Sequence, residues 1–216
     1  MKIKICKECI IPSSKPDLEF SSDGICQGCL AYKNRFSINW QERQTKLIEI
    51  FRKYKKHKNY DCIIPVSGGK DSYFQVIKIL ELGFNPLCIT ATTDKLTDLG
   101  RSNIENLKKL GVDHIEVSTD PVIRRKINKF TLETVGDISW VEHLAIFTIP
   151  AKFSCSLDIP LIIWGENPQN ENGGPIDREA EIRLDRAWLE EFGGLLGLRV
   201  TDLSDVLNVE KKKLEL

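Results

Sequence analysis

The chain has 216 residues, of which 41% are hydrophobic and 29% are charged. That composition is typical of a globular protein and excludes a disordered chain. Its 31 basic and 31 acidic residues cancel, which argues against nucleic-acid binding through overall charge. No apolar run approaches 18 residues and no signal-peptide pattern follows Met1, so we expect a cytoplasmic protein without a membrane span.

Four of the seven cysteines fall within the first 30 residues, as two C-x2-C pairs. They are Cys6, Cys9, Cys26 and Cys29. Two intervening residues allow both sulfurs of a pair to face one ion, and Gly24 and Gly28 suit the tight turns that this requires. The spacing predicts a four-thiolate Zn²⁺ site, with an iron–sulfur cluster or free thiols as alternatives. We therefore expect a zinc-binding module over residues 1–35 and a separate domain over 36–216.

From about Trp40 onwards, apolar strands alternate with helical patterns. The predicted strands are Tyr60–Val66, Asn85–Ala91, His114–Val117 and Ile159–Trp164. The predicted helices are 40–57, a run ending at Leu82, Leu99–Leu110, Pro121–Leu132, Trp140–Leu157 with a kink or break at Pro150, and Arg178–Phe192. Because buried strands separated by helices pair in parallel, this order predicts an α/β fold with a doubly wound parallel sheet.

A glycine-rich loop, Ser67–Ser72 (SGGKDS), lies between the first predicted strand and the helix that follows it. Its two glycines leave backbone N–H groups unobstructed, the helix N-terminus adds partial positive charge, and Lys70 adds a full charge. Asp71 provides a carboxylate that suits Mg²⁺ between phosphates. The loop is too short for a Walker A motif. It predicts a phosphate-binding cradle, and the alternative is an ordinary glycine-rich turn before a helix.

In this position the loop resembles the SGGxDS signature of the PP-loop ATP pyrophosphatase superfamily. Those enzymes split ATP between its α and β phosphates, adenylate a substrate oxygen and release pyrophosphate, after which a nucleophile displaces AMP. The resemblance implies the following roles: Ser67, Gly68, Gly69 and Ser72 hold the pyrophosphate, Lys70 neutralises it, and Asp71 acts through Mg²⁺. It also implies that the stretch after the second strand, represented by Thr92, contacts the adenosine.

Two further segments carry candidate site residues. Glu166 and Asn167 follow the last predicted strand, at the edge of the sheet where doubly wound folds bind ligands. We expect Glu166 to contact the nucleotide or its metal and Asn167 to contact the substrate, unless both only cap a polar loop. The other segment holds Asp137, Trp140, Glu142 and His143, which could grip a sugar or could simply start an apolar helix.

Taken together, the cysteine pairs, the SGGKDS loop, residues 136–143 and residues 163–171 resemble the N-acetyl sugar amidotransferase family of bacterial surface-polysaccharide and nonulosonic acid pathways, including lipopolysaccharide biosynthesis. The resemblance implies conversion of an acetamido group on a sugar to an acetamidino group. It implies sugar contacts from Trp140, Glu142 and His143, and ammonia from a separate glutaminase partner, because no cysteine here has the setting of a glutaminase nucleophile.

Two alternatives stay open. A PP-loop tRNA-thiolating enzyme also combines cysteine pairs with this loop, but it needs reactive cysteines near the ATP site. Here Cys62, Cys88 and Cys155 lie in or beside apolar runs, and we expect them to be buried. The second alternative is a truncated module that binds nucleotide without catalysis, since members of the amidotransferase family continue beyond the position of Leu216.

Overall fold

The computed structural model describes residues 3–14, 18–56, 59–92, 95–166, 184–191 and 193–214. These residues form two compact units. One runs to Leu47 and includes Glu166 and Leu184, and the other comprises Ile48–Gly165 and the residues from Asp185 onwards. The boundary between the units falls within helix α2 (Trp40–Tyr54). The cysteine pattern alone would put it earlier, at residue 35. No helix of the described residues is long and apolar enough to cross a membrane.

The first unit is built around its cysteines and contains little regular structure. Two isolated antiparallel bridges close turns in this unit: Ile5 with Pro12 encloses the first cysteine pair, and Phe20 with Cys26 leads into the second. Helix α1 (Gln27–Asn34) begins directly after Cys26, and a short 3₁₀ turn, η1 (Arg35–Ser37), follows it. The sequence pattern did not predict α1, because the metal-ligand spacing conceals its helical period.

The second unit contains a parallel three-stranded sheet in the order β1 (Cys62–Pro65), β2 (Pro86–Thr92) and β3 (Asp113–Ser118). The register places Ile63 beside Leu87 and Ile89 beside Ile115. The remaining elements are α3 (Lys70–Glu81), α4 (Asp98–Lys108), α5 (Pro121–Val135), α6 (Trp140–Leu157), α8 (Arg186–Glu191), α9 (Val200–Leu207) and η2 (Lys211–Lys213). The predicted α/β fold with a parallel sheet is therefore confirmed.

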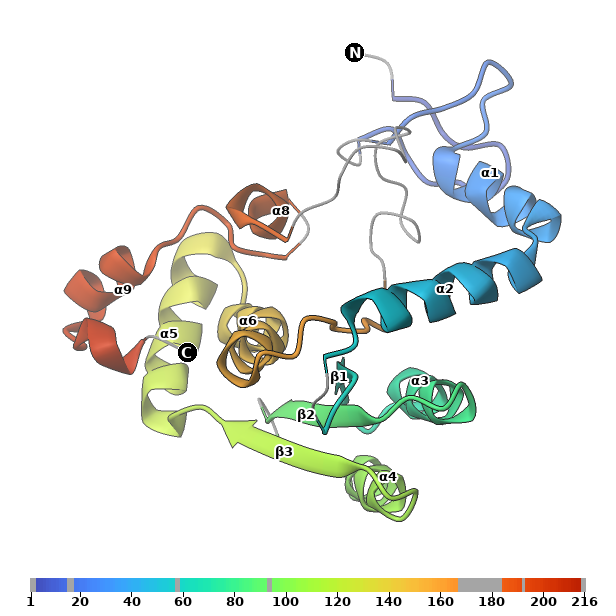
Figure 1. The fold of residues 1–216 in the computed structure, drawn as a ribbon. Coiled ribbons are helices and arrows are strands. Elements are labelled where there is room, and N and C mark those ends of the chain that lie inside the picture. The colour runs from blue at the N-terminus through green and yellow to red at the C-terminus, as the bar shows by residue number, and fades with distance from the viewer. Residues whose placement is uncertain are drawn as a thin grey trace. The chain divides into compact units, whose positions relative to one another are not determined.

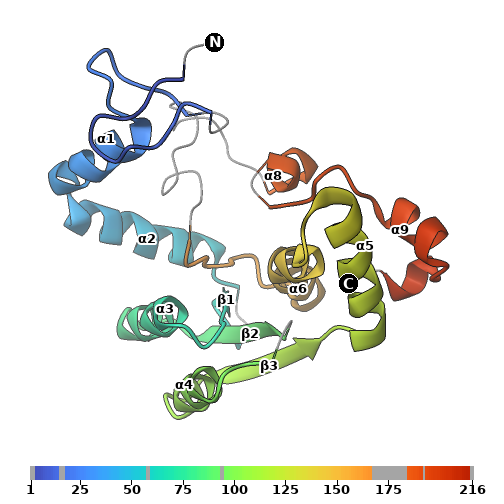
Figure 2. The same ribbon diagram turned by 180° about the vertical axis from the view of Figure 1, so that it is seen from behind.

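Helices cover both faces of this sheet, as a doubly wound fold requires. Side chains alternate between the faces of a strand, so Ile63, Leu87 and Ile89 share one face, where they pack with Ala145 and Ile149 of α6. Helix α3 also contacts β1 and β2. Figures 1 and 2 show α3 and α4 together on one side of the strands, and α5 and α6 together on the other.

The strand predicted at residues 159–164 was wrong, and of the kink or break predicted at Pro150 the break is absent. Residues 159–164 do not form a strand: they make a single parallel bridge, in which Ile63 N donates to Leu161 O (2.8 Å) and Ile163 N donates to Ile63 O (2.8 Å). The next bond of such a ladder would need an N–H from residue 65, which is a proline. Helix α6 continues through Pro150 without the expected break. Of the predicted helix 178–192, only its end, α8, lies within the described residues.

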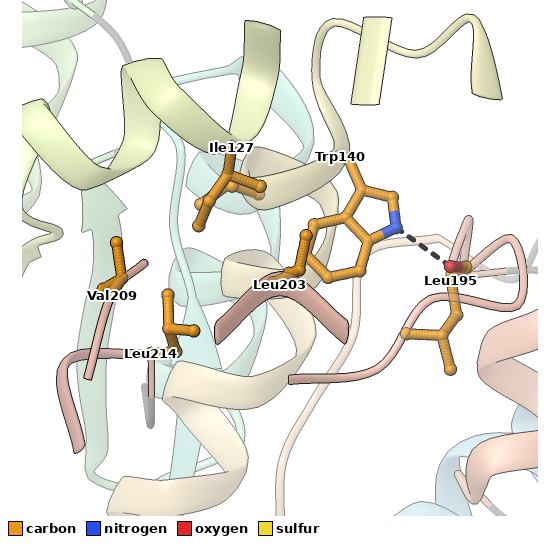
Figure 3. Packing of buried hydrophobic residues seen from close by; sticks show 7 residues of the cluster. Ile127, Trp140, Leu195, Leu203, Val209 and Leu214 are labelled. Atoms are coloured by element: carbon orange, nitrogen blue, oxygen red, sulfur yellow. Dashed lines mark hydrogen bonds between the residues drawn. The ribbon is translucent and has the colours of Figure 1, made fainter. Parts of the chain in front are cut away.

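A second apolar cluster joins α5, α6 and the C-terminal elements (Figure 3). Its buried members are Ile127, Trp140, Val141, Leu195, Leu203, Val209 and Leu214. The indole N–H of Trp140 donates to the carbonyl oxygen of Leu195 (2.9 Å), as Figure 3 shows. Helix α9 supplies Leu203 to this cluster and was not predicted from the sequence.

We predict that Phe51→Ala lowers the free energy of unfolding of the second unit by about 3–5 kcal/mol. Phe51 is fully buried and stacks on Phe84, with ring centroids 4.1 Å apart, so truncation leaves a cavity. The matched control is Ile50→Ala on the same helix, where the side chain is 46% exposed and the expected cost is about 0.5 kcal/mol. Chemical denaturation measures both, and equal costs would contradict the packing described.

Candidate functional site

The glycine-rich loop lies where the sequence predicted it, between β1 and the first turn of α3. Its two serines fold it back on itself: Gly69 N donates to Ser67 Oγ (3.3 Å), Ser67 N donates to Ser72 Oγ (3.4 Å), and Ser72 Oγ donates to Gly69 O (3.1 Å). The N-cap residue of α3 is Gly69, which has no side-chain oxygen to offer to the first N–H groups of the helix. A helix start of this kind suits an anion.

Two neighbouring elements hold the loop. At its entry, Val66 N donates to Ile89 O (2.9 Å) and the hydroxyl of Thr90 donates to Val66 O (2.7 Å). In its middle, Gly68 has φ +79° and packs so closely on α4 that an added Cβ would lie 2.5 Å from the carbonyl oxygen of Gly100. Only glycine fits at Gly68, both because of its φ angle and because of this close approach.

The two charged residues of the loop lie at its exposed side. Lys70 Nζ is 2.8 Å and 2.9 Å from the two carboxylate oxygens of Asp71, and the side chains are 88% and 62% exposed. Solvent screens a pair this exposed, so the contact is worth little and exchanges readily for a phosphate or a cation. The donor set therefore fits a phosphate chain with Mg²⁺, although the sequence had not predicted that these residues pair with each other.

Four buried polar atoms of the second unit have no hydrogen-bond partner among the described residues: Gln75 Oε1, Thr92 Oγ1, Thr119 Oγ1 and Asn128 Oδ1. Of these, Thr92 lies at the end of β2 and Gln75 lies on α3, the elements that adjoin the loop. Thr92 shares its sheet face with Thr90, which bonds to the base of the loop. Gly165 lies beside Gln75, since a Cβ on it would be 3.1 Å from Gln75 Oε1. Unpaired buried polar atoms are costly and are often satisfied by a ligand or water. Thr92 was predicted as a site residue; Gln75 was missed, because no motif marks it.

The predicted residues after the last strand segment stay predictions. Glu166 is exposed and belongs to the first unit, whereas the loop belongs to the second. Asn167 lies outside the described residues.

The predicted sugar-binding segment is largely part of the interior. Trp140 is 5% exposed in the apolar cluster, which leaves no indole face for a sugar ring. Glu142 is also buried and accepts two hydrogen bonds from Asn128 Nδ2 (2.9 and 3.0 Å). Only His143 is well exposed, with Nδ1 3.8 Å from Asp137 Oδ2. Trp140 and Glu142 thus join α6 to Leu195 and to Asn128 of α5, and we do not propose them as sugar contacts.

The four N-terminal cysteines converge as the spacing predicted. All four Sγ atoms lie within 4.8 Å of one another, with Cys9 to Cys26 at 3.5 Å and Cys6 to Cys29 at 4.0 Å. Tetrahedral Zn²⁺ with Zn–S bonds of about 2.3 Å requires sulfurs about 3.8 Å apart. The arrangement therefore fits one tetrahedral ion, whereas the thiolates of a four-iron cluster each bind a different iron.

The backbone prepares one of these sulfurs for a metal. Amide groups of Cys26 (3.2 Å) and Glu8 (3.4 Å) donate to Cys6 Sγ. Hydrogen bonding from the backbone of Cys9, then of Cys26 and Glu8, lowers the pKa of Cys6 to about 6. Burial raises the pKa of Cys26 and Cys29, so a cation at the centre would favour the deprotonated form of these two sulfurs.

The three remaining cysteines differ in exposure. Cys62 and Cys88 are fully buried in β1 and β2, and burial raises the pKa of each to about 12, so both are neutral and inert at physiological pH. Cys155 was expected to be buried but is exposed near the end of α6. The apolar run that suggested burial is a helix with one side turned to solvent.

No family model matches the chain. A protein from Methanocaldococcus jannaschii, the uncharacterised MJ1599, is 30% identical over 108 residues, which span 48% of this chain and 38% of that protein. Less than two fifths of that relative's length is thus matched.

Among solved structures, the chain is similar to three. An NH₃-dependent NAD synthetase from Campylobacter jejuni has 15% identity, coverage of 82% and 77% of the two chains, and a TM-score of 0.48. The NMN synthetase from Francisella tularensis has 14% identity, coverage of 82% of this chain and 85% of that chain, and a TM-score of 0.42. A predicted tRNA methyltransferase subunit from Methanocaldococcus jannaschii has 20% identity, coverage of 69% of this chain and 64% of that chain, and a TM-score of 0.30. All three TM-scores are below 0.5, so the fold class rests on the sheet of this chain itself.

We predict that the purified protein carries about one zinc per chain and that Cys26→Ser releases it, because three thiolates bind Zn²⁺ much more weakly than four. The first unit should loosen while the second stays folded. Cys155→Ser, which changes an exposed thiol outside the cluster, should keep its zinc. Elemental analysis decides the assignment, and iron in place of zinc would refute it.

We also predict that iodoacetamide at pH 8 alkylates Cys155 in the native protein and leaves Cys62 and Cys88 unmodified until the protein unfolds. The two buried thiols are neutral and inaccessible, and Cys155 is exposed. Peptide mass spectrometry locates the label. Rapid native labelling of Cys62 or Cys88 would contradict the structure and revive a thiol-based reaction.

Proposed function

We propose that the chain is an ATP-using enzyme of the PP-loop type, and that the Ser67–Ser72 loop binds the phosphates. The observation that carries this proposal is the placement of the SGGKDS motif: it follows a parallel strand, starts a helix capped by glycine, and stands between β2 and α4. The hydroxyl of Thr92 at the adjacent strand end, which has no hydrogen-bond partner in the described part of the chain, supports a nucleotide contact there. Loop, strand end and helix start together suit a triphosphate attached to a nucleoside.

The proposed reaction forms an amidine from an N-acetylated sugar, as the sequence resemblance suggests. An amide carbonyl is a poor electrophile, and its oxygen is a poor leaving group. Transfer of AMP from ATP to that oxygen releases pyrophosphate and turns the oxygen into part of a phosphate leaving group. Ammonia then adds to the carbon, AMP departs with the oxygen, and the added nitrogen gives up its surplus protons to solvent, so that an amidine C=N replaces the amide C=O.

The residues of the loop would act chiefly through electrostatics. Backbone N–H groups at the start of α3 would bind the departing pyrophosphate, and Lys70 would neutralise charge that develops on it. Asp71 would hold Mg²⁺, which when bound shields the phosphates from one another. Ser67 and Ser72 would keep the loop folded through their contacts with Gly69.

The remaining parts of the proposal concern zinc and ammonia. Zn²⁺ at the four cysteines would stabilise the first unit, because all four ligand positions are filled and no open position is left for chemistry. Ammonia would come from a separate glutaminase, since Cys62 and Cys88 are buried and neutral and the exposed Cys155 lies in no sequence pattern of a glutaminase nucleophile.

Lys70→Ala and Asp71→Asn should each lower the rate of AMP and pyrophosphate formation from ATP by about 10²–10³, as expected for loss of a preorganised charge. Neither should unfold the protein, since both side chains are exposed. The matched controls are Lys78→Ala and Glu81→Gln, an exposed ion pair at the other end of α3, which should leave the rate unchanged. The assay is AMP release with an N-acetylated sugar and ammonia.

The products distinguish the alternatives. An amidinated sugar is about 1 Da lighter than its amide and is cationic at neutral pH, because an amidine is a far stronger base than an amide. ADP and phosphate in place of AMP would refute the PP-loop assignment. AMP with sulfur on tRNA would identify a thiolating enzyme, and nucleotide binding without turnover would indicate a non-catalytic module.

A further inference from the structure

The glycine-rich loop has a structural weakness that follows from its own sequence. Gly68 and Gly69 flank one peptide group, and glycine adopts positive and negative φ with similar ease. The backbone of these two glycines therefore gives the peptide group between them little preference for one orientation. In a trans peptide the carbonyl and the N–H point in opposite directions, so a rotation would exchange their places. A phosphate near Gly69 N–H would then meet a carbonyl oxygen and be repelled.

A side chain outside the motif holds this peptide group in one orientation. Asn103 on α4 donates from Nδ2 to the carbonyl oxygen of Gly68 (2.8 Å), which keeps that oxygen turned toward α4. The N–H of the same peptide group, on Gly69, lies on the opposite side, where Ser67 Oγ accepts from it (3.3 Å). The amide of Asn103 thus selects the orientation in which the Gly69 N–H faces away from α4, where an anion can share it with Ser67 Oγ.

The helix that carries Asn103 is itself fixed against the loop. Thr97 caps α4 by accepting from Gly100 N (3.1 Å), and Gly100 has no side chain, so the backbone of α4 comes close to Gly68. Arg101, one residue on, pairs with Glu116 of β3 (2.5 Å). The pair with Glu116 ties α4 to the sheet, and the close approach of Gly100 to Gly68 places Asn103 within reach of the loop.

We propose that Asn103 is a positioning residue for pyrophosphate: it locks the Gly68–Gly69 peptide so that the loop presents its N–H groups to the phosphates. This inference rests on the proposed function of the loop. It adds a residue on α4, 31 positions or more beyond the SGGKDS motif, to the parts on which phosphate binding depends.

The test measures binding of inorganic pyrophosphate with Mg²⁺ to the full chain by calorimetry. Asn103→Leu replaces the amide with an apolar group of similar size, and we expect affinity for pyrophosphate to fall roughly tenfold or more. Asn106→Leu is the matched control, because Asn106 lies on the same helix and its side chain contacts only Lys109 among the hydrogen bonds described. The control should bind pyrophosphate as the unaltered chain does.

If Asn103 had a purely structural role, its replacement would lower the melting temperature of the ligand-free protein, and pyrophosphate binding would weaken only as far as the protein loses stability. We expect instead an unchanged melting temperature with weakened binding. Asn103→Ala, which adds no bulk, provides the same comparison if Asn103→Leu folds poorly. Unaltered pyrophosphate affinity in a folded Asn103 variant would overturn the inference alone. An unaltered chain that binds no pyrophosphate would overturn the proposed function, and the inference with it.

Discussion

The pairing of β1 with β2 is the constraint on which the candidate site depends. Strand β1 has only four residues, and Pro65 ends its ladder on the side of Ile163. On the other side, Val66 remains bonded to Ile89 and Thr90, so the chain leaves the sheet at a fixed place and in a fixed direction. The loop and the start of α3 follow from that exit, because a right-handed crossover to β2 must place the helix against the sheet.

The same segment illustrates how rigidity is divided between backbone and tertiary contacts. Glycines let the loop approach α4, but they also remove the conformational preference that would keep the loop in one shape. That preference is replaced by the hydrogen bonds that Ser72 accepts from Ser67 N and donates to Gly69 O, and by those that Thr90 and Asn103 donate. A phosphate-binding loop built in this way gains its order from β2 and α4, and these elements belong to the site as much as the motif does.

The two compact units are stabilised in different ways. The second buries apolar residues on both faces of a sheet and in a further cluster around Trp140. The first has few buried apolar side chains among its described residues, and its cysteines are the groups that converge. A bound metal commonly stabilises a unit whose apolar core is small, and the proposed zinc would do so here.

Local patterns in the sequence determined the four-cysteine cluster, the parallel sheet and the strand–loop–helix setting of SGGKDS, since each depends on spacing or period over a few residues. Tertiary structure decided the rest. Apolar character alone made residues 159–164 look like a strand and Cys155 look buried, but Pro65 on a neighbouring strand limits the first and the packing of α6 exposes the second. The burial of Trp140 and the reach of Asn103 to Gly68 join residues far apart in the chain, and no local pattern contains such contacts.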